Sequence, residues 1–224
     1  WLLPRHCLLC LGPATGIDLC AACRDALPRI ENPCSSCGAP LAAGRLCARC
    51  LKSPLNFHRV CIPYRYDGPV PTLIHALKFR HRLAAASVLG QLLAQSLQAA
   101  RPGLPQCLLP VPLHPLRQRQ RGFNQSVEIA RPLSLRLGIP IVPRLARRTR
   151  ATAAQTGLVG AKARQRNMRG AFAVEKNFPA GLTHVAIVDD VVTTGATVRS
   201  LALTLKSAGV SRIELWCVAR VADA

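Results

Sequence analysis

The residues best suited to chemistry lie in one run, from Val185 to Thr197, in which apolar residues lead into two acids. The apolar residues 185–188, without a polar break, predict a central strand of a parallel sheet, and such strands end at binding sites. Asp189 and Asp190 would repel each other at that end unless donors or a counter-charge lay nearby. The hydroxyl groups of a ribose, with Mg²⁺ close by, would supply both. The acids therefore indicate a sugar-binding site.

The residues that follow Val192 are small or carry hydroxyl groups, which suits the binding of a phosphate group. They are Thr193, Thr194, Gly195, Ala196 and Thr197. The apolar spacing behind them predicts a helix, and the first N–H groups of a helix lack partners within it and attract anions. The glycine lets the backbone come close to a ligand. The alternative is that the acids form a solvated turn and the threonines merely cap the helix.

Cysteines dominate the N-terminal part of the chain, where they form repeated Cys-x-x-Cys units. The units are Cys7 and Cys10, Cys20 and Cys23, Cys34 and Cys37, and Cys47 and Cys50. Two such units can complete a tetrahedral Zn²⁺ shell, so the count predicts two structural zinc ions, whose binding should be what folds this segment. Sequential pairing of the units is preferred, and crossed or nested pairings stay open. The alternatives are a disulfide framework, which needs an oxidising compartment, and redox-active pairs.

The chain is strongly basic, with 30 Lys and Arg residues against 10 Asp and Glu residues and a formal net charge of +20. Most of the cations are arginines, whose planar donor fork suits phosphate oxygens. This excess favours nucleic acid as a partner, although a general bias of composition toward Ala and Arg would produce the same charge.

Targeting signals are weak. No apolar run reaches the length of about 18 residues that a membrane span needs, and the first residues lead straight into cysteines. We therefore expect a cytoplasmic protein without membrane insertion. The oligomeric state is not indicated.

A change in composition near residue 55 divides the chain into two expected domains. The cysteine units end there, and residues 51–57 have the polar and proline content of a linker. Residues 1–55 should form the Cys-rich zinc module and residues 56–224 a second domain. In that domain, apolar patterns predict strands at 59–66, 106–112, 185–188 and 212–219, with helices at about 70–77, 83–97, from 124 and from 198. Alternating strands and helices predict an α/β domain with a mainly parallel sheet flanked by helices.

A second set of candidate ligand-binding residues follows the strand expected at 106–112. The set comprises Leu113, His114, Arg117 and Arg121. The arginines would place positive charge where a second phosphate group could lie, although an exposed basic loop would have the same composition. His114 suits a general acid or a phosphate ligand, and a structural histidine fits equally well. Asn124 suits the cap of the next helix, which Pro132 should kink.

Residues 147–158 are basic, polar and rich in small side chains, and they include Gln155. Such a segment suits a mobile lid that closes over a polyanion and excludes water. A disordered surface loop is the alternative.

Taken in order, several motifs along the whole chain resemble those of the ComF/GntX family. They are the four Cys-x-x-Cys units, Leu77-Lys78-Phe79, Pro110-Val111-Pro112, residues 121–126, 148–155 and 164–167, and the Asp-Asp segment. The last segment is similar to the binding signature of type I phosphoribosyltransferases, which bind phosphoribosyl pyrophosphate. The resemblance implies a type I phosphoribosyltransferase-like fold with ribose hydroxyls at Asp189 and Asp190 and the 5′-phosphate at residues 193–197. It also implies a role in competence or DNA utilisation.

Three hypotheses follow for the function. The first is a phosphoribosyltransferase that binds phosphoribosyl pyrophosphate with Mg²⁺, its pyrophosphate near Leu113 and the arginines after it, and transfers the ribosyl group to an acceptor that the sequence does not identify. The second is a protein that holds single-stranded DNA, together with other competence proteins, through its basic surface and zinc module. The third is a sensor that binds phosphoribosyl pyrophosphate without turnover.

Overall fold

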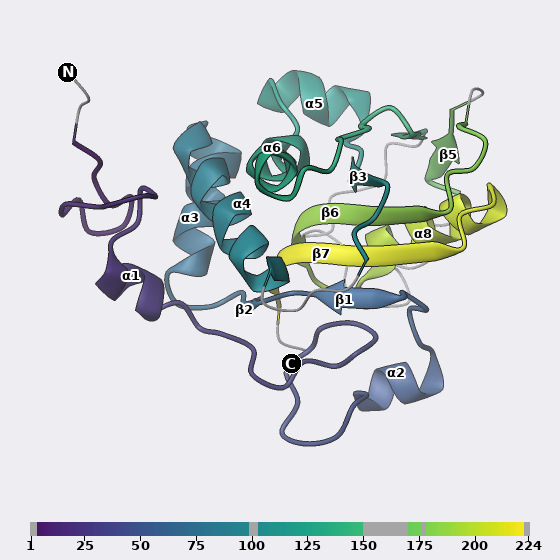
Figure 1. Cartoon of the computed structure of the whole chain (residues 1–224), viewed down its shortest axis with the longest axis horizontal. Coiled ribbons are helices and arrows are strands. Elements are labelled where there is room, and N and C mark those ends of the chain that lie inside the picture. The colour runs from purple at the N-terminus through teal and green to yellow at the C-terminus, as the bar shows by residue number, and fades with distance from the viewer. Residues whose placement is uncertain (1–3, 99–102, 150–169, 176–177, 222–224) are drawn as a thin grey trace.

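The computed structural model describes residues 4–98, 103–149, 170–175 and 178–221, and its centre is a parallel β-sheet (Figure 1). The sheet has five strands in the order β1-β7-β6-β3, with β2 also paired to β7. Its strands are β1 (Arg59–Cys61), β2 (Tyr64–Arg65), β3 (Cys107–Pro110), β6 (His184–Val192) and β7 (Arg212–Arg220). Each of these pairings is parallel, which confirms the mainly parallel α/β fold expected from the alternating pattern.

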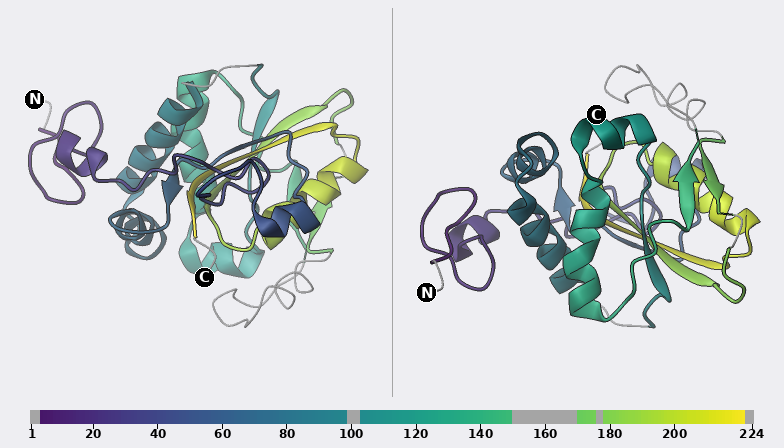
Figure 2. Two further views of the ribbon diagram at one scale, coloured as in Figure 1. Left: turned by 90° about the horizontal axis from the view of Figure 1, so that it is seen from below. Right: turned by 90° about the horizontal axis from the view of Figure 1, so that it is seen from above.

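Helices cover both faces of the sheet (Figure 2). The larger helices of the chain are α3 (Val70–Arg80), α4 (Leu83–Gln98), α6 (Gln125–Leu137) and α8 (Ala196–Ser207). Helices α3, α4 and α6 share one core with the side chains of Ala186 and Val188, whereas α8 shares the other core with Val185 and Ile187. Because successive side chains of β6 point to opposite faces, its apolar run is buried on both sides.

Three smaller elements complete the described part of this domain. Helix α5 (Pro115–Arg121) follows β3, and β4 (Ala146–Arg148) pairs antiparallel with β5 (Phe172–Val174) in a separate two-stranded ribbon. The ribbon packs beside α8 through Ala146 and Phe172. Arg148, at the end of β4, lies within Coulombic reach of Asp189, so this end of the ribbon stands near the carboxyl end of β6.

Two expectations about the elements need correction. The strand expected at 59–66 is interrupted, because Pro63 has no N–H to donate to the ladder and separates β1 from β2. The arginines after His114, for which a loop was considered, form helix α5, which Pro115 begins and Gly122 ends with a left-handed φ of 79°. Pro132 lies inside α6 as expected.

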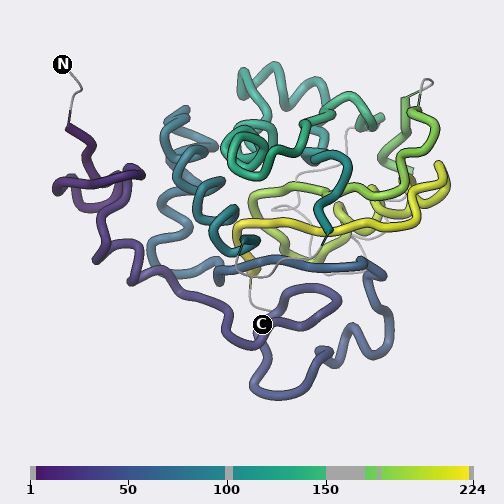
Figure 3. Tube along the Cα trace, viewed as in Figure 1, coloured from purple at the N-terminus to yellow at the C-terminus, as the bar shows by residue number. Residues whose placement is uncertain are grey.

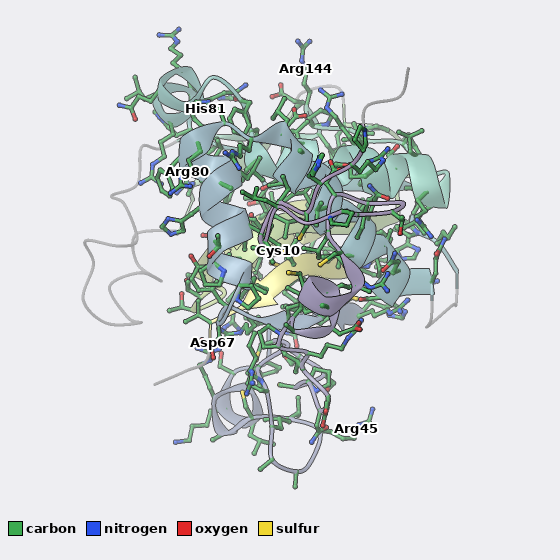
Figure 4. The ribbon with its side chains drawn as sticks, turned by 90° about the vertical axis from the view of Figure 1, so that its left-hand side faces the viewer. Cys10, Arg45, Asp67, Arg80, His81 and Arg144 are labelled. Carbon is green, nitrogen blue, oxygen red and sulfur yellow. The ribbon has the colours of Figure 1, made fainter. Side chains whose placement is uncertain are left out.

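The Cys-rich segment forms two separate lobes of the same design. The first contains α1 (Ala21–Asp25) and the second contains α2 (Ala48–Lys52). In each lobe the third cysteine of the four caps the short helix, as Cys20 and Cys47 do. Figure 3 follows the chain from the first lobe, beside α3, to the second lobe below β1. Figure 4 shows Cys10 in the first lobe and Arg45 at the tip of the second, well apart from each other.

In the part of the chain that the structure describes, none of the helices combines the length and hydropathy that a membrane crossing would require.

Candidate functional site

The two acids of the Asp-Asp segment were expected at the end of the strand, but they lie within β6, which continues beyond them. The strand continues to Val192 because Asp189 pairs with Cys217, and Val191 with Ala219, on β7. Asp189 and Asp190 keep only 8% and 3% of their surface exposed. Buried carboxylates need partners, because an unpaired charge in the interior is strongly disfavoured.

Partners for both acids come from helices that are distant in the sequence. Ser126, in the first turn of α6, donates its hydroxyl to Asp189 Oδ1 at 3.0 Å. The same oxygen accepts the backbone N–H of Asp190 at 2.9 Å. Lys78 of α3 forms an ion pair with Asp190 through Nζ and Oδ2. The pair of acids is therefore tied to two helices of the same core.

One lysine cannot neutralise two carboxylates, and the pKa of Asp189 reflects this. Burial, and then the neighbouring charge of Asp190, raises the pKa of Asp189 to about 8, although Lys78 opposes the change. For Lys78, burial lowers the pKa but attraction to Asp190 outweighs it, so the pKa of the ammonium group is raised. Without ligand the cluster therefore holds Asp189 close to neutral, and an arriving cation or hydrogen-bond donor would favour its ionised form.

The raised pKa of Asp189 should make the stability of the fold depend on pH. Its pKa is about 8 in the folded chain against an ordinary value of 3.8, so the folded state holds the proton more tightly. The folded state is then increasingly penalised as the pH rises from the lower to the higher value. We expect Asp189→Asn, which does not ionise, to lose less stability than the unaltered protein between about pH 4 and pH 8 in urea denaturation. Parallel pH profiles of the two proteins would contradict this origin.

The turn after β6 has the geometry expected of an anion-binding segment. Gly195 caps α8 with a left-handed φ of 76°, which a residue with a side chain rarely adopts. Thr194 Oγ1 accepts the N–H of Ala196 at 3.4 Å. A shallow hollow is lined by Asp189, Val191, Val192, Thr193, Gly195, Ala196, Thr197 and Val198. Four of the five residues predicted to hold a phosphate, all except Thr194, therefore share one hollow with the first of the two acids.

Residues 121–126 lead from helix α5 to Ser126, which contacts Asp189. Most of these residues form a specific contact. Gly122 ends α5, and Asn124 caps α6 by accepting the N–H of Ser126 at 3.0 Å. The Asn124 amide also donates to the carbonyl of Val111 at 3.0 Å, which fixes the loop after β3. Arg121 donates to Gln125 and lies over the ring of Phe79 at 5.9 Å. The segment thus holds Ser126 against Asp189 and an arginine beside the lysine helix.

The pKa values of the arginines at this edge depend on the buried acids and on the neighbouring arginines. Burial lowers the pKa of Arg121, Asp190 opposes the shift, and Arg117 adds to it. The pKa of Arg148 on β4 is likewise lowered by burial and by Arg117, and Asp189 opposes the shift. These mutual effects require that the guanidinium groups lie within Coulombic reach of the acids. Positive charge therefore gathers at the carboxyl edge of the sheet.

The remaining predicted residues differ in where they lie. Leu113 and His114 follow β3 at this same edge, half-buried. His114 accepts the N–H of Leu116 at its Nδ1, 3.3 Å away, and so acts as the cap of α5. This contact supports a structural use of that ring nitrogen. Gln155, and with it most of the expected lid, lies outside the described residues.

Three side chains of the site were given no role from the sequence. Lys78 stood in a quoted motif but received no role, and Ser126 and Arg148 were likewise unassigned. A lysine inside an otherwise apolar helix face is a usable signal, because its neighbours Ile74 and Leu77 are fully buried. No comparable signal marks Ser126, whose partner is 63 positions away in the chain.

The eight cysteines gather into two groups of four, one in each lobe. The groups are Cys7, Cys10, Cys20 and Cys23, and Cys34, Cys37, Cys47 and Cys50. Within each group all sulfur atoms lie within 4.8 Å of one another. The Cys10–Cys20 and Cys37–Cys47 sulfur pairs are each 3.7 Å apart. A tetrahedral zinc with bonds of about 2.3 Å has sulfur–sulfur edges of about 3.8 Å.

This geometry fits two structural zinc ions and places the Cys-x-x-Cys units in sequential pairs. In each group the pKa of one cysteine is lowered, which favours the thiolate form of its side chain. Burial raises the pKa of Cys7, but backbone N–H groups of Cys10, Cys20 and Leu9 outweigh burial and lower the pKa to about 6. The same balance lowers the pKa of Cys34 to about 7. Thiolates that accept backbone N–H groups are ready to bind a cation.

Comparisons with known proteins extend along nearly the whole chain. A family profile described as a double zinc ribbon domain matches residues 1–51. The DNA utilization protein YhgH of Escherichia coli (strain K12) is 39% identical over 225 residues, which cover 97% of this chain and 98% of that protein. Competence protein F of Haemophilus influenzae is 35% identical over 90% of each chain. Competence protein ComFC of Bacillus subtilis is 25% identical over 88% of this chain and 83% of its own.

Proposed function

This chain belongs to the family of DNA utilization and competence proteins that includes YhgH and competence protein F, and on that premise we propose that it binds phosphoribosyl pyrophosphate with Mg²⁺. The binding site is the carboxyl edge of the sheet around Asp189 and Asp190. One observation carries the proposal: of two adjacent buried acids, Asp190 pairs with Lys78, and Asp189 shares a hollow with the glycine-capped start of α8.

Each part of this site suits one part of the ligand. The turn at residues 193–197 offers backbone N–H groups and hydroxyls to the 5′-phosphate, at the positive end of the dipole of α8. The carboxylates of Asp189 and Asp190 accept hydrogen bonds from the ribose hydroxyls. Arg117 and Arg121 face the pyrophosphate, whose departure they stabilise by charge. Magnesium, bound with the ligand, would offset the pyrophosphate charge, and the carboxylate oxygens are donors that this ion prefers.

Calorimetric titration of the purified protein with phosphoribosyl pyrophosphate and Mg²⁺ tests this function. The combined change Asp189→Asn and Asp190→Asn should weaken binding by about a hundredfold or more, since a hydrogen bond to a charged group is worth about 1.5–3 kcal/mol. Asp25→Asn is the matched control, because Asp25 is an exposed acid of the first lobe and should leave the affinity unchanged. Equal affinity of the double variant would refute the assignment.

Binding alone does not distinguish an enzyme from a sensor. A phosphoribosyltransferase releases pyrophosphate when a nucleophile attacks C1′ of the ribose, through a transition state with positive charge on the ring. Release should therefore be measured with nucleobases, ammonia and DNA as acceptors. Release with one of them identifies a transferase, and tight binding without release with any of them identifies a sensor.

A second candidate function, binding of single-stranded DNA, is favoured by the exposed cations of α5. Arg119 is exposed, and Arg117 and Arg121 are half-buried beside it. Phe79 keeps 64% of its surface exposed near Arg121 and could stack on a base. The names of the relatives refer to DNA utilization and to competence, which suits a chain that acts on DNA together with other competence proteins.

Arg119→Ala should weaken the binding of single-stranded DNA and flatten its salt dependence, because each phosphate contact contributes about 0.7 to the logarithmic slope. Fluorescence anisotropy at several salt concentrations measures both quantities. Arg45→Ala is the control, since Arg45 is exposed at the tip of the second lobe, away from α5 (Figure 4). An unchanged slope in Arg119→Ala would remove α5 from the DNA contact.

A reducing compartment is part of the same proposal. Two groups of four cysteines at zinc-site distances keep their metal only while the thiols stay reduced. The cytoplasm meets that condition.

A further inference from the structure

A buried arginine joins the second cysteine group to the anion-binding turn. Arg220 is the last residue of β7 and none of its surface is exposed. Its Nε donates to the carbonyl oxygen of Cys37, a predicted metal ligand, at 3.2 Å. Its Nη1 donates to the carbonyl oxygen of Val192 at 3.2 Å and to that of Thr193. One guanidinium group therefore contacts both the metal-binding loop and the first residues of the turn.

The planar shape of the guanidinium gives these contacts a geometric consequence. Its N–H groups point in fixed directions, so carbonyls bound to different nitrogens are held at a fixed separation. A buried guanidinium must also keep its hydrogen bonds, because leaving such a group unsatisfied costs more than the bonds gain. Movement of the Cys37 loop would thus pull the guanidinium away from Val192 and Thr193, or expose it.

A second set of contacts joins the same two parts of the chain. Gly195, at the start of α8, lies so close to Leu55 that a Cβ there would be 3.1 Å from Leu55 Cδ1. Leu55 is in turn fixed by its N–H, which donates to Ser36 Oγ at 2.8 Å. Arg199 of α8 donates to Ser53 Oγ at 2.9 Å and to the Pro54 carbonyl at 2.8 Å. The segment between the last cysteine and residue 56 therefore covers the start of α8.

The first cysteine group lies elsewhere. Its loop is closed by bonds within itself, such as that from Leu8 N–H to the Asp18 carbonyl at 3.0 Å. Its apolar residues Ile17 and Leu19 belong to the core that contains α3 and α4, not to the core of α8. Figure 1 shows this lobe beside α3, on a different side of the molecule from α8. The two groups are alike in sequence, but the second lies against the turn and the start of α8, whereas the first lies against the core of α3 and α4.

We propose that Arg220 is a positioning residue that holds the anion-binding turn in place from the second cysteine group, so that the affinity of the turn depends on that group and not on the first. This inference rests on the proposed binding of phosphoribosyl pyrophosphate. The zinc ion of the second group then supports the ligand site directly, whereas the zinc ion of the first group stabilises its own lobe.

The experiment compares Arg220→Lys and Arg199→Ala with Arg212→Ala. Arg212 is the control because it bonds to His58 at 2.9 Å at the opposite edge of the sheet. Two quantities are measured on each full-length protein loaded with zinc: amide hydrogen exchange of residues 191–198 without ligand, and the affinity for phosphoribosyl pyrophosphate with Mg²⁺. Arg220→Lys should speed exchange there and weaken binding by about 5- to 150-fold, the usual range of coupling between sites. Arg199→Ala, a change at the surface, should do both to a smaller degree.

A matched pair of cysteine variants tests the role of the second group. Cys47→Ser and Cys20→Ser each replace the third ligand of one group, and zinc content reports the loss of one ion. Faster exchange at 191–198 in Cys47→Ser but not in Cys20→Ser supports the inference. Equal exchange in both, or unaltered exchange in Arg220→Lys and Arg199→Ala, overturns it. Exchange requires no ligand, so an unaltered protein that fails to bind phosphoribosyl pyrophosphate would defeat the proposed function without affecting this comparison.

Discussion

Replacing Lys78 by methionine should destabilise the fold by about 3–5 kcal/mol, because it leaves the carboxylate of Asp190 buried without its ion-pair partner. Only 4% of the Asp190 side chain is exposed, so water cannot replace the lysine. Asp189 adds little to the loss, because its raised pKa already keeps it close to neutral near pH 7. The midpoint of urea unfolding, followed by circular dichroism, measures the effect.

A double variant shows whether charge or packing causes the loss. Adding Asp190→Asn to Lys78→Met removes the unpaired charge and should recover most of the stability. The control is Arg131→Met, which breaks the ion pair with Glu128 at 2.9 Å on the surface of α6. That pair is exposed, so its loss should change stability by about 0–1 kcal/mol. If the double variant is as unstable as Lys78→Met alone, the aliphatic stem of the lysine matters more than its charge.

Removing zinc with a strong chelator should unfold the two lobes while the α/β domain stays folded, and the first lobe should unfold before the second. Binding of a structural zinc is worth about 10–16 kcal/mol in small zinc-binding peptides, more than the few apolar residues of either lobe can replace. The order follows from burial, because Cys10 of the first group is exposed whereas Cys34, Cys37 and Cys50 of the second are buried.

Zinc release and amide hydrogen exchange, followed together during chelation, would measure this order. Two phases of zinc release are expected, with residues 4–27 losing protection in the first and residues 34–56 in the second. Cys107→Ala is the control, since Cys107 is buried in β3 outside both groups and should leave the zinc content at two ions. Release in one phase, with equal loss of protection in both lobes, would contradict the different placement of the groups.

Local patterns were enough to predict those parts of the protein whose partners are close in the chain. The Cys-x-x-Cys units predicted the metal groups, because a turn of four residues by itself brings two sulfur atoms together. The run 185–188 predicted the buried strand, because a strand covered on both faces must be apolar throughout. The turn at 193–197 was also predicted from residues that are close in the chain, since its glycine and threonines follow the strand directly.

One wrong expectation arose because a pairing partner decided the outcome, and two arose from proline and glycine signals in the chain itself. The acids were expected at the end of the strand, but β7 pairs alongside them and extends β6 to Val192. The arginines after His114 form a helix because Pro115 and Gly122 set its ends, a signal that was present but not used. The strand expected at 59–66 is divided because one proline removes a donor from the ladder.

The sequence by itself indicated the chemistry: two acids before a turn suited to phosphate, a strong excess of positive charge, and enough cysteines for two metal ions. Which Cys-x-x-Cys units share an ion was decided by the structure. Only the tertiary structure decided how these parts depend on one another. Ser126 reaches Asp189 across 63 positions, and Arg220 reaches Cys37 across 183 positions. Contacts over such separations leave no local pattern, because the residues meet only after the sheet and its helices have packed. For that reason the lysine beneath the acids and the arginine that joins the zinc lobe to the turn became visible only in the folded chain.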